Sequence, residues 1–339
     1  MHRQRKKLSL EMSWKTIVTL VTMAVIQGMT PTLGLTWGQD GHRIVGALAD
    51  RALAGSRAEH EIRALLQPKE TLENISFWAD CAKGYCGELT EEMKTFVQSN
   101  PTHHHYHYTD VPFQRLQYQW KSFGTSADDV VALLTQAIRV LQGTRESGEN
   151  PHALTPRQAL LLIAHCIGDV HQPLHVGSAY LDQDDAFIDP SMREDIRAGA
   201  VEATSGGNRL LIDGGRSLHA YWDSTVVRYA MRRATTDSVA SYINTLIAKY
   251  PIHEEMNGDP MTWPLRWAED SLQLAKQVHA GLTVQKRRRV TNSKYGDQWV
   301  WSVTLPSKYD QHASTAAEQA LVRAGNRLAR LLRAIWPES

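Results

Sequence analysis

Cysteines and long apolar runs are scarce in this chain of 339 residues. The sequence has three cysteines, which suits an exported protein with few disulfides. Beyond residue 36 no apolar run is long enough to be a candidate membrane span. Strand-like alternation is also scarce, and we find no internal repeat and no low-complexity linker. What remains is helical periodicity, which recurs along the chain.

An excess of charge of one sign is missing as well. The chain has 37 Lys and Arg against 36 Asp and Glu, and residues 1–36 hold five of the basic residues and one acid, which leaves 32 against 35 or a net charge of −3. Composition therefore provides no strong basic field for duplex DNA, so a nucleic acid would have to be held locally, for example by metal ions. The one basic cluster, Lys286–Arg289, is interpreted as a solvated loop.

The first 36 residues have the pattern of a secretory signal peptide. Basic residues dominate positions 1–15, and an apolar run follows from Thr16 to Ile26. The run is short for a membrane span, and an uncleaved signal-like anchor is the alternative. We expect cleavage before Trp37, a secreted or periplasmic protein, and no membrane span after cleavage.

Two of the cysteines are close enough in sequence to pair. Cys81 and Cys86 enclose the loop A-K-G-Y and could form a disulfide in an oxidising compartment. Cys166 is left over on an apolar stretch, where we expect a buried, inert thiol.

Helix signals are clear at three places. An apolar stripe predicts a helix over residues 128–142 with Ser126 as its N-cap. Thr155 and Pro156 are typical of the N-cap and first position of the next helix. The last helix is predicted from Ser314 to Ile335.

About 303 residues follow the predicted leader, enough for one large domain or two ordinary ones. We predict an all-α fold, a single mostly helical domain over residues 37–339. The polar stretch 178–205 is interpreted as a surface insertion. A calcium loop is the alternative, but its acidic residues lack the regular spacing around a central glycine. These acids are Asp182, Asp184, Asp185, Asp189, Glu194 and Asp195.

Residues 165–175 read H-C-I-G-D-V-H-Q-P-L-H and concentrate the residue types that bind metals. His165 and Asp169 are four apart, so on a helix they share a face and can bind one ion. Pro173 cannot continue the helix, so His175 comes from a different piece of backbone and is predicted to serve a second ion. The preceding residues are apolar on nearly every side, and a buried Asp169 would need a partner such as a metal. For any single histidine, an ordinary polar helix residue is the alternative.

Further candidate ligands lie in four other motifs. His219 and Asp223 repeat the four-residue spacing of His165 and Asp169. Two helices that each present this pair predict a polynuclear site. The motifs are W-G-Q-D-G-H at 37–42, W-A-D at 78–80, H-Y-T-D at 107–110 and H-A-Y-W-D at 219–223.

In this order the motifs resemble those of the trinuclear-zinc single-strand-specific nucleases. These are secreted endonucleases and 3′-nucleotidases of fungi, plants, protists and bacteria, and they share their fold and zinc cluster with bacterial phospholipase C. The matching motifs run from Trp37 to Asp223 and include G-G-N at 206–208, and A-G-N-R-L-A-R-L-L from Ala324 is similar to the family's last helix. The resemblance covers nearly all of the chain after residue 36 and implies a mostly helical domain of the phospholipase C/nuclease type.

The resemblance implies three Zn²⁺ ions, and nitrogen and carboxylate ligands suit zinc. The first ion would be bound by Asp80, His107, His165 and Asp169. The second would be bound by His175, His219 and Asp223. The third would be bound by Trp37, through its amino nitrogen and carbonyl oxygen, by His42 and by a bridging Asp169.

An amino ligand at Trp37 makes signal cleavage part of the chemistry. A free α-amino group has a pKa of roughly 7.7 to 8 and can give up its proton to a metal near neutrality, whereas an amide nitrogen cannot. We therefore expect a residue or tag ahead of Trp37 to abolish most activity. Thr36 departs from the small-residue pattern of cleavage sites.

The resemblance also implies catalytic and substrate-binding residues. Asp110 would orient or deprotonate the attacking water. Alternatively, it would only accept a hydrogen bond from a group that binds the metal. Lys83 stands at a position where Arg is expected. Lysine keeps the positive charge but cannot donate the two parallel hydrogen bonds of an arginine guanidinium. Tyr108 would stack an unpaired base, and Asn208 would hydrogen-bond that base.

The histidines next to His107 leave two possible alignments of the H-Y-x-D motif. H-Y occurs twice, at His105 and at His107, and only His107 is followed at the right distance by Asp110. His103, His104 and His105 are interpreted as exposed loop residues.

The implied activity is zinc-dependent hydrolysis of phosphodiester bonds in single-stranded DNA and RNA to 5′-phosphorylated products, together with 3′-nucleotidase activity. No stable protein partner is implied. Two other classes stay open. A zinc-dependent phospholipase C would be expected to have Glu in the motif that here reads H-x-x-W-D, and a non-catalytic zinc-binding envelope protein would bind ions without hydrolysis.

Overall fold

The structure is a computed structural model and describes residues 37–143, 148, 150–236, 238–250, 256–292 and 296–338. The predicted signal peptide, residues 1–36, lies outside the described residues, so its cleavage stays a prediction. Among the residues that are described, no helix is both long and apolar enough to cross a membrane.

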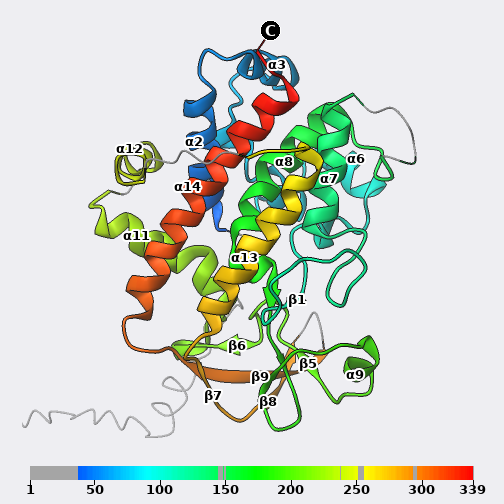
Figure 1. Cartoon of the computed structure of the whole chain (residues 1–339), viewed down its shortest axis with the longest axis vertical. Helices are drawn as coiled ribbons and strands as arrows, with labels where there is room; N and C mark the ends of the chain where they lie inside the picture. Colours follow the sequence, from blue (N-terminus) through cyan, green and yellow to red (C-terminus); the bar gives the residue numbers. More distant parts are fainter. Residues whose placement is uncertain are drawn as a thin grey trace, which may run out of the picture. The chain divides into compact units, whose positions relative to one another are not determined.

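Helices form most of the fold (Figure 1), which confirms the predicted helical class. The α-helices are α2 (Gln39–Leu53), α3 (Arg57–Leu65), α4 (Leu72–Ile75), α5 (Trp78–Ala82), α6 (Glu91–Ser99), α7 (Val130–Leu141), α8 (Pro156–His171), α9 (Arg193–Arg197), α10 (Leu218–Ala220), α11 (Val227–Arg233), α12 (Val239–Lys249), α13 (Trp263–His279) and α14 (Tyr309–Ile335). Short 3-10 turns are η1 (His103–His105), η3 (Pro173–His175), η4 (Asp213–Gly215) and η6 (Pro260–Thr262), and η5 (Tyr221–Val226) is a π-helical turn.

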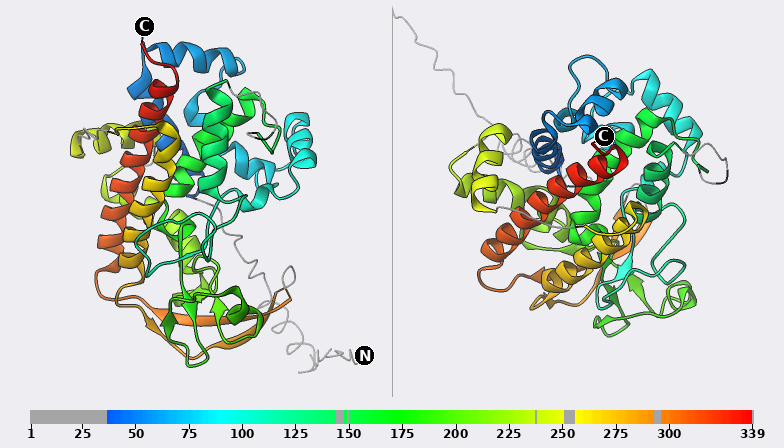
Figure 2. Two further views of the ribbon diagram at one scale, coloured as in Figure 1. Left: turned by 45° about the vertical axis from the view of Figure 1, so that its right-hand side comes forward. Right: turned by 45° about the horizontal axis from the view of Figure 1, so that its top comes forward.

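Short strands gather at one end of the helices (Figures 1 and 2). They are β1 (Val111–Pro112), β2 (Gly177–Ser178), β3 (Tyr180–Leu181), β4 (Phe187–Ile188), β5 (Glu202–Ala203), β6 (Leu210–Leu211), β7 (Thr283–Val284), β8 (Arg288–Asn292) and β9 (Gly296–Thr304). β1 and β2 pair in parallel, β3 lies between β4 and β5, and β9 pairs with β6, β7 and β8.

Helix α8 is the centre of the fold. Every residue from Ala159 to His171 is buried, because the helix packs against α2, α7, α13 and α14. Its start follows the prediction: the Thr155 side chain accepts a hydrogen bond from Gln158 N, and Pro156 is at the first turn. A polar side chain in this stretch is therefore removed from solvent whichever way it points, which decides how His165 and Asp169 behave.

Two other helix predictions need correction at their starts. Helix α7 begins at Val130, and its N-cap is Asp129, not Ser126, because Asp129 accepts hydrogen bonds from Val131 N and Ala132 N. The carboxylate can satisfy two backbone donors at once, whereas Ser126 lies too far upstream. Helix α14 ends at Ile335 as predicted but begins at Tyr309.

Segment 178–205 contains more regular structure than a loop. It forms the three-stranded sheet of β3, β4 and β5 and the short helix α9. Its two ends are buried at Ser178 and Thr204, and α9 is mostly exposed. Its acids bind protein groups: Asp182 Oδ1 accepts from two backbone N–H groups, and Asp189 pairs with Arg115.

The interpretation of the basic cluster as a loop is wrong for half of its members. Arg288 and Arg289 lie in β8, opposite Val300 and Trp299 of β9. Both arginine side chains are exposed, as predicted. The guanidinium of Arg289 lies 6.0 Å from the centre of the Trp299 ring, so an aromatic partner in the neighbouring strand supports a strand at this position.

The cysteine predictions are confirmed. Cys81 and Cys86 form a disulfide, and Cys166 is a buried free thiol. Burial raises the pKa of the Cys166 thiol well above its ordinary value, which keeps it protonated.

Candidate metal centre

The parallel pair β1–β2 brings two predicted ligand motifs together. Val111 lies opposite Gly177, and Thr109 N donates a hydrogen bond of 2.8 Å to His175 O. The segment that carries His107 therefore runs beside the turn that carries His175. Both come to lie against the C-terminal half of α8, where His165 and Asp169 are buried.

The first group of potential metal ligands consists of Asp80, His107 and His165. His107 Nδ1 lies 3.0 Å from His165 Nε2 and 3.8 Å from Asp80 Oδ1, and His165 Nε2 lies 3.9 Å from the same carboxylate oxygen. Ligand atoms of a tetrahedral ion with bonds of about 2.0 Å lie roughly 3.3 Å apart, so these three atoms can share one ion.

Asp169 connects this group to a second one, formed by His42, His165 and Asp169. Its Oδ2 lies 3.0 Å from both His107 Nδ1 and His165 Nε2, while its Oδ1 lies 3.4 Å from His42 Nε2. The two oxygens thus face different groups, as a bridging carboxylate requires.

Gly168 makes the position of His42 possible. A Cβ at Gly168 would lie 2.7 Å from His42 Nδ1 and 2.9 Å from His42 Cε1. Only a residue without a side chain lets the His42 ring lie flat on α8, where it stacks on His165 with 3.9 Å between ring centres. A glycine inside this helix is therefore explained by a close approach and not by a turn.

The third group consists of His175, His219 and Asp223. Asp223 Oδ1 lies 3.6 Å from His175 Nε2, and Asp223 Oδ2 lies 3.3 Å from His219 Nε2. His219 lies in α10 and Asp223 lies in the π-helical turn η5. π-turns interrupt helices most often at functional sites, and here the turn directs the carboxylate to the ring four residues earlier.

Backbone carbonyls orient three of the histidines. His165 Nδ1 donates to Ser76 O, His175 Nδ1 to His107 O and His219 Nδ1 to Gly206 O, at 2.7 to 2.8 Å. A carbonyl can only accept, so each ring carries its proton on Nδ1 and presents the lone pair of Nε2 to the site. This arrangement is typical of histidines that bind metals.

Polar atoms in the centre lack the partners that buried atoms normally have. Among the described residues, Asp169 Oδ1, His175 Nε2 and Asp223 Oδ2 are buried and have no hydrogen-bond partner. Leaving such acceptors unpaired is costly, and a cation would satisfy all three. Both the geometry and the donor set therefore fit bound metal ions.

Protonation of the site follows from burial and from Asp169. Burial lowers the pKa of three rings, which keeps them neutral as metal ligands must be: His42, His107, whose pKa falls to about 3, and His219. Burial alone would raise the pKa of Asp169, but His165 and His175 hold it well below the ordinary value. The centre thus holds an ionised carboxylate beside three neutral rings, and this carboxylate outweighs burial and raises the pKa of the other two, His165 and His175.

Trp37 lies at the edge of the centre. Its side chain is fully buried, and the next residue, Gly38, donates from its backbone N–H to Asp223 O at 2.6 Å. The start of the predicted mature chain is therefore tied to the helix that carries the third group.

Lys83 and Asp110 lie beside the groups. Lys83 Nζ is 3.2 Å from Asp80 Oδ1. Burial disfavours the ammonium, but Asp80 outweighs this effect and the pKa of Lys83 is raised. Desolvation raises the pKa of Asp110 to about 6, against the opposing influence of Ser178 and Arg209.

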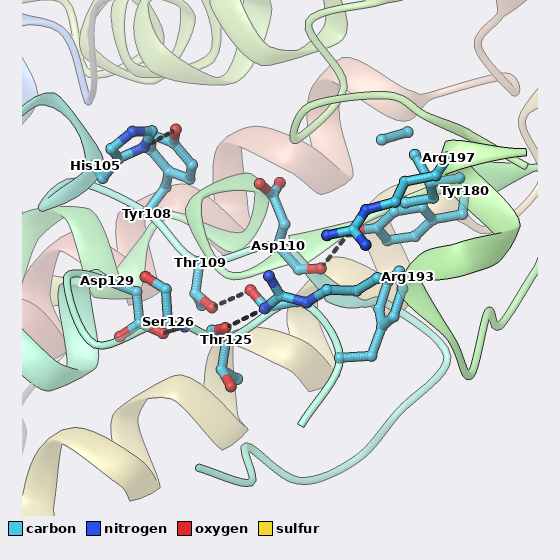
Figure 3. Close-up of a pocket in the computed structure, with 14 residues that line it drawn as sticks. His105, Tyr108, Thr109, Asp110, Thr125, Ser126, Asp129, Tyr180, Arg193 and Arg197 are labelled. Atoms are coloured by element: carbon cyan, nitrogen blue, oxygen red, sulfur yellow. Dashed lines mark hydrogen bonds between the residues drawn. The ribbon is translucent and has the colours of Figure 1, made fainter. Parts of the chain in front are cut away.

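A pocket of about 420 Å³ opens next to Asp110 (Figure 3). Tyr108 lines it together with His105, and the Tyr108 hydroxyl lies 2.8 Å from His105 Nδ1. Asn208 is exposed and is not among the lining residues; its side chain donates to Ser205 O.

The sequence model of the S1/P1 Nuclease family matches residues 37–337. The chain belongs to this family. Relatives include Endonuclease 4 of Arabidopsis thaliana, 24% identical over 328 residues, which cover 89% of this chain and 90% of the relative. Nuclease S1 of Aspergillus oryzae (strain ATCC 42149 / RIB 40) is 23% identical over 329 residues, which cover 92% of this chain and 94% of the relative. The resemblance inferred from the motifs is therefore confirmed.

Several residues at the candidate metal centre and its pocket were not predicted from the sequence. Gln172 donates from Nε2 to Asp223 Oδ1 at 2.6 Å and so orients a carboxylate of the third group. The position of Gln172 inside the motif H-Q-P-L-H was a signal from which a role at the site could have been predicted. His104 and His105 are exposed as predicted, whereas His103 is half-buried, and all three lie in the 3-10 turn η1. His105 also borders the pocket, and Arg193 and Arg197 border it from α9. No local pattern marked these three, because only the folded chain brings them to Tyr108.

Proposed function

We propose that this nuclease is a secreted, zinc-dependent enzyme that hydrolyses phosphodiester bonds of single-stranded DNA and RNA to 5′-phosphorylated products, with 3′-nucleotidase activity. The observation that carries the proposal is the set of three buried His/Asp groups, of which the first two are connected by Asp169. Three carboxylates, Asp80, Asp169 and Asp223, would face three dications, which leaves a positive pocket that attracts phosphate although the protein as a whole is near neutral.

The ligand assignment follows the geometry with one addition. Asp169 would be shared by the first and second groups, and the amino nitrogen and carbonyl oxygen of Trp37 would complete the second group with His42. Nitrogen and carboxylate ligands in small, closed sets favour zinc over calcium or magnesium, which prefer oxygen. Bound zinc lowers the pKa of water towards neutrality and stabilises charge on phosphoryl and leaving oxygens.

The chain's own residues would complete the chemistry. The Asp110 carboxylate, with its pKa raised to about 6, suits a group that orients water and accepts a proton near neutral pH. Lys83 would bring a positive charge to the phosphoryl oxygens, and its contact with Asp80 holds the ammonium close to the first group. Asp110 would thus accept the proton of the attacking water, and Lys83 would stabilise the negative charge of the transition state.

Preference for unpaired strands would come from the pocket. Tyr108 follows the ligand His107 directly and offers an aromatic face that can stack on a splayed base. A base inside a duplex has both faces covered and cannot enter such a pocket. Asn208, exposed on the loop after Gly206 and Gly207, would hydrogen-bond the base if the substrate extends to that loop.

Secretion is supported by three features. The first 36 residues have the composition of a signal peptide. The disulfide Cys81–Cys86 is typical of an oxidising compartment. A free amino group at Trp37 would exist only after cleavage, so export and completion of the zinc site would be one event.

The test is an assay of the processed protein beginning at Trp37. Release of acid-soluble nucleotides is measured from single-stranded DNA, RNA and duplex DNA of the same sequence, with zinc, after chelation and after zinc is restored. We expect cleavage of the single strands, loss after chelation, recovery with zinc, and release of phosphate from 3′-AMP. His165→Ala should be inactive, and His60→Ala, which changes an exposed histidine on α3, should keep full activity.

Phosphatidylcholine is included as a competing substrate. Hydrolysis of the lipid alone would move the protein to the phospholipase C class. Binding of zinc without turnover of any substrate would identify a zinc-binding envelope protein and would overturn the proposal.

A further inference from the structure

The pocket beside Asp110 has a second wall that the proposed chemistry does not use. Tyr108 lies on one side, and Arg193 and Arg197 of α9 reach towards Asp110 from the other (Figure 3). This wall belongs to segment 178–205, which contributes no metal-capable group among the described residues. The volume of about 420 Å³ is that of a small-molecule site and accommodates one nucleotide unit.

Arg193 is held in place across the pocket. Its Nη2 donates a hydrogen bond of 2.9 Å to Thr125 O, and Thr125 also lines the pocket. One hydrogen bond leaves most of the five guanidinium N–H groups available to a ligand. The bond therefore orients the side chain without using up its capacity to bind.

Arg197 contributes little to stability in this position. Its side chain is 77% exposed, and its ion pair with Glu194, at 4.0 Å, joins two exposed groups. Such pairs contribute about 0–1 kcal/mol. Arg193 and Arg197 are four residues apart, and like charges at this spacing destabilise a helix. The two arginines on this face of α9 therefore provide no evident gain in the stability of the folded protein.

Asp129, the carboxylate that lines the pocket at the start of α7, is already engaged. Asp129 accepts hydrogen bonds from Val131 N and Ala132 N and from the hydroxyl of Tyr118 at 2.7 Å. It serves as the cap of α7 and is turned to that helix. The guanidinium groups of α9 therefore present positive charge to the pocket.

We propose that Arg193 and Arg197 bind a phosphate of the nucleotide next to the scissile phosphodiester, so that segment 178–205 makes the enzyme prefer polynucleotides to the smallest substrates. The inference rests on the proposed nuclease function. Guanidinium groups bind phosphate through paired, charge-assisted hydrogen bonds. A dinucleoside monophosphate contains only the phosphate that is cleaved, so it cannot use these contacts, whereas a longer strand can.

The experiment compares kcat/KM for a dinucleoside monophosphate and for a longer single-stranded oligonucleotide. The variants are Arg197→Gln, Arg193→Gln and the double variant. We expect kcat/KM on the oligonucleotide to fall about tenfold for each arginine, the size of one charge-assisted hydrogen bond, with the dinucleoside unchanged. The slope of log kcat/KM against log salt should become shallower by about 0.7 for each lost phosphate contact.

The controls distinguish three causes of a lower rate: loss of positive charge, loss of the paired hydrogen bonds of a guanidinium, and loss of folding. Arg57→Gln/Arg63→Gln removes the same two charges from α3, at the other end of the helices (Figure 1), and should leave both substrates unaffected. Arg193→Lys/Arg197→Lys should keep the salt dependence while losing part of the rate on the oligonucleotide. Arg197 is largely exposed, so its variant should keep the melting temperature of the parent protein.

Each outcome has a separate meaning. Equal losses on both substrates, or no loss on the oligonucleotide, would overturn the role of α9. If the parent protein cleaves neither substrate, the proposed nuclease function fails and not this inference alone.

Discussion

The three His/Asp groups and the α9 wall border the same short segment, residues 107–110, and are built in opposite ways. The metal-capable side chains are buried, and backbone carbonyls orient three of their rings. The wall is a five-residue helix whose arginines are exposed, with one hydrogen bond to the rest of the pocket. Metal coordination needs atoms placed to within a few tenths of an ångström, whereas attraction between charges falls off slowly with distance. The proposed metal centre therefore requires a rigid, buried setting, whereas the proposed phosphate contact does not.

The largest effect on activity is expected at Asp169, because the first and second groups both depend on its carboxylate. Asp169→Asn keeps the shape of the side chain but removes the charge that both neighbouring groups share. We expect loss of at least one bound zinc and a fall in activity beyond the roughly 10–100-fold of changes around ligands. Zinc content and strand cleavage are measured on the same preparation. Asp195→Asn, the same chemical change on α9, should alter neither; full zinc content in Asp169→Asn would show that the carboxylate is not shared.

A second expected effect concerns the start of the mature chain. A protein that keeps Met ahead of Trp37 has an amide where the proposed amino ligand would be, so we expect activity to fall by at least about tenfold. An extra residue at the C-terminus should have no effect and serves as the control. Removal of the added Met by an aminopeptidase should restore the rate. Full turnover by the extended protein would exclude Trp37 as an amino ligand.

Gly168→Ala tests the close approach of His42 to α8. In most helices this change stabilises by about 0.5–1 kcal/mol, but here the new Cβ would meet the His42 ring at 2.7 Å. We expect His42 to be displaced, with lower affinity for one zinc and about tenfold less activity. Titration with a zinc indicator measures the loss. Ala164→Gly, at a buried position one turn earlier, should lower stability without changing the number of ions bound.

The last prediction concerns stability and not activity, at the joint between helices and strands. His279, near the end of α13, stacks on Phe113 with 4.3 Å between ring centres, and burial lowers its pKa to about 4. The unfolded state, with an ordinary pKa near 6.5, binds this proton first, so stability is complete above pH 6.5 and falls by about 1.4 kcal/mol per pH unit towards pH 4.

Urea unfolding between pH 7.5 and 4.5 measures this slope. We expect His279→Gln to show a smaller decrease towards acid than the parent protein, while His60→Gln, on exposed α3, should match the parent. Equal slopes in all three proteins would mean that His279 is protonated in the folded state as readily as in the unfolded one.

Much of the metal centre was predictable because its ligands follow local rules. His165 and Asp169 share a helix face at a spacing of four, and Pro173 places His175 outside that helix. Whether these residues really bind zinc stays a prediction, but the structure brings nearly all of the proposed side chains into three groups. The helix start at Thr155 and the disulfide were equally local features.

The errors share one physical cause. Ser126 was a plausible cap in sequence, but Asp129 can accept two backbone hydrogen bonds and takes the role. Arg289 reads as a loop residue until Trp299 of β9 lies opposite it. In each case the deciding partner was not part of the local pattern.

The sequence by itself determined the helical class, the residue types that bind metals and the family to which the chain belongs, because periodicity and ligand spacing are properties of neighbours along the chain. Only the tertiary structure decided that Asp169 faces two groups with its two oxygens, that Gly168 admits His42, and that Arg193 and Arg197 face Tyr108 across a pocket. These contacts join residues up to 127 positions apart along the chain, since Gly168 and His42 or Asp169 and His42 meet only after the core has packed. Packing, and not propensity, sets which distant side chains share a site.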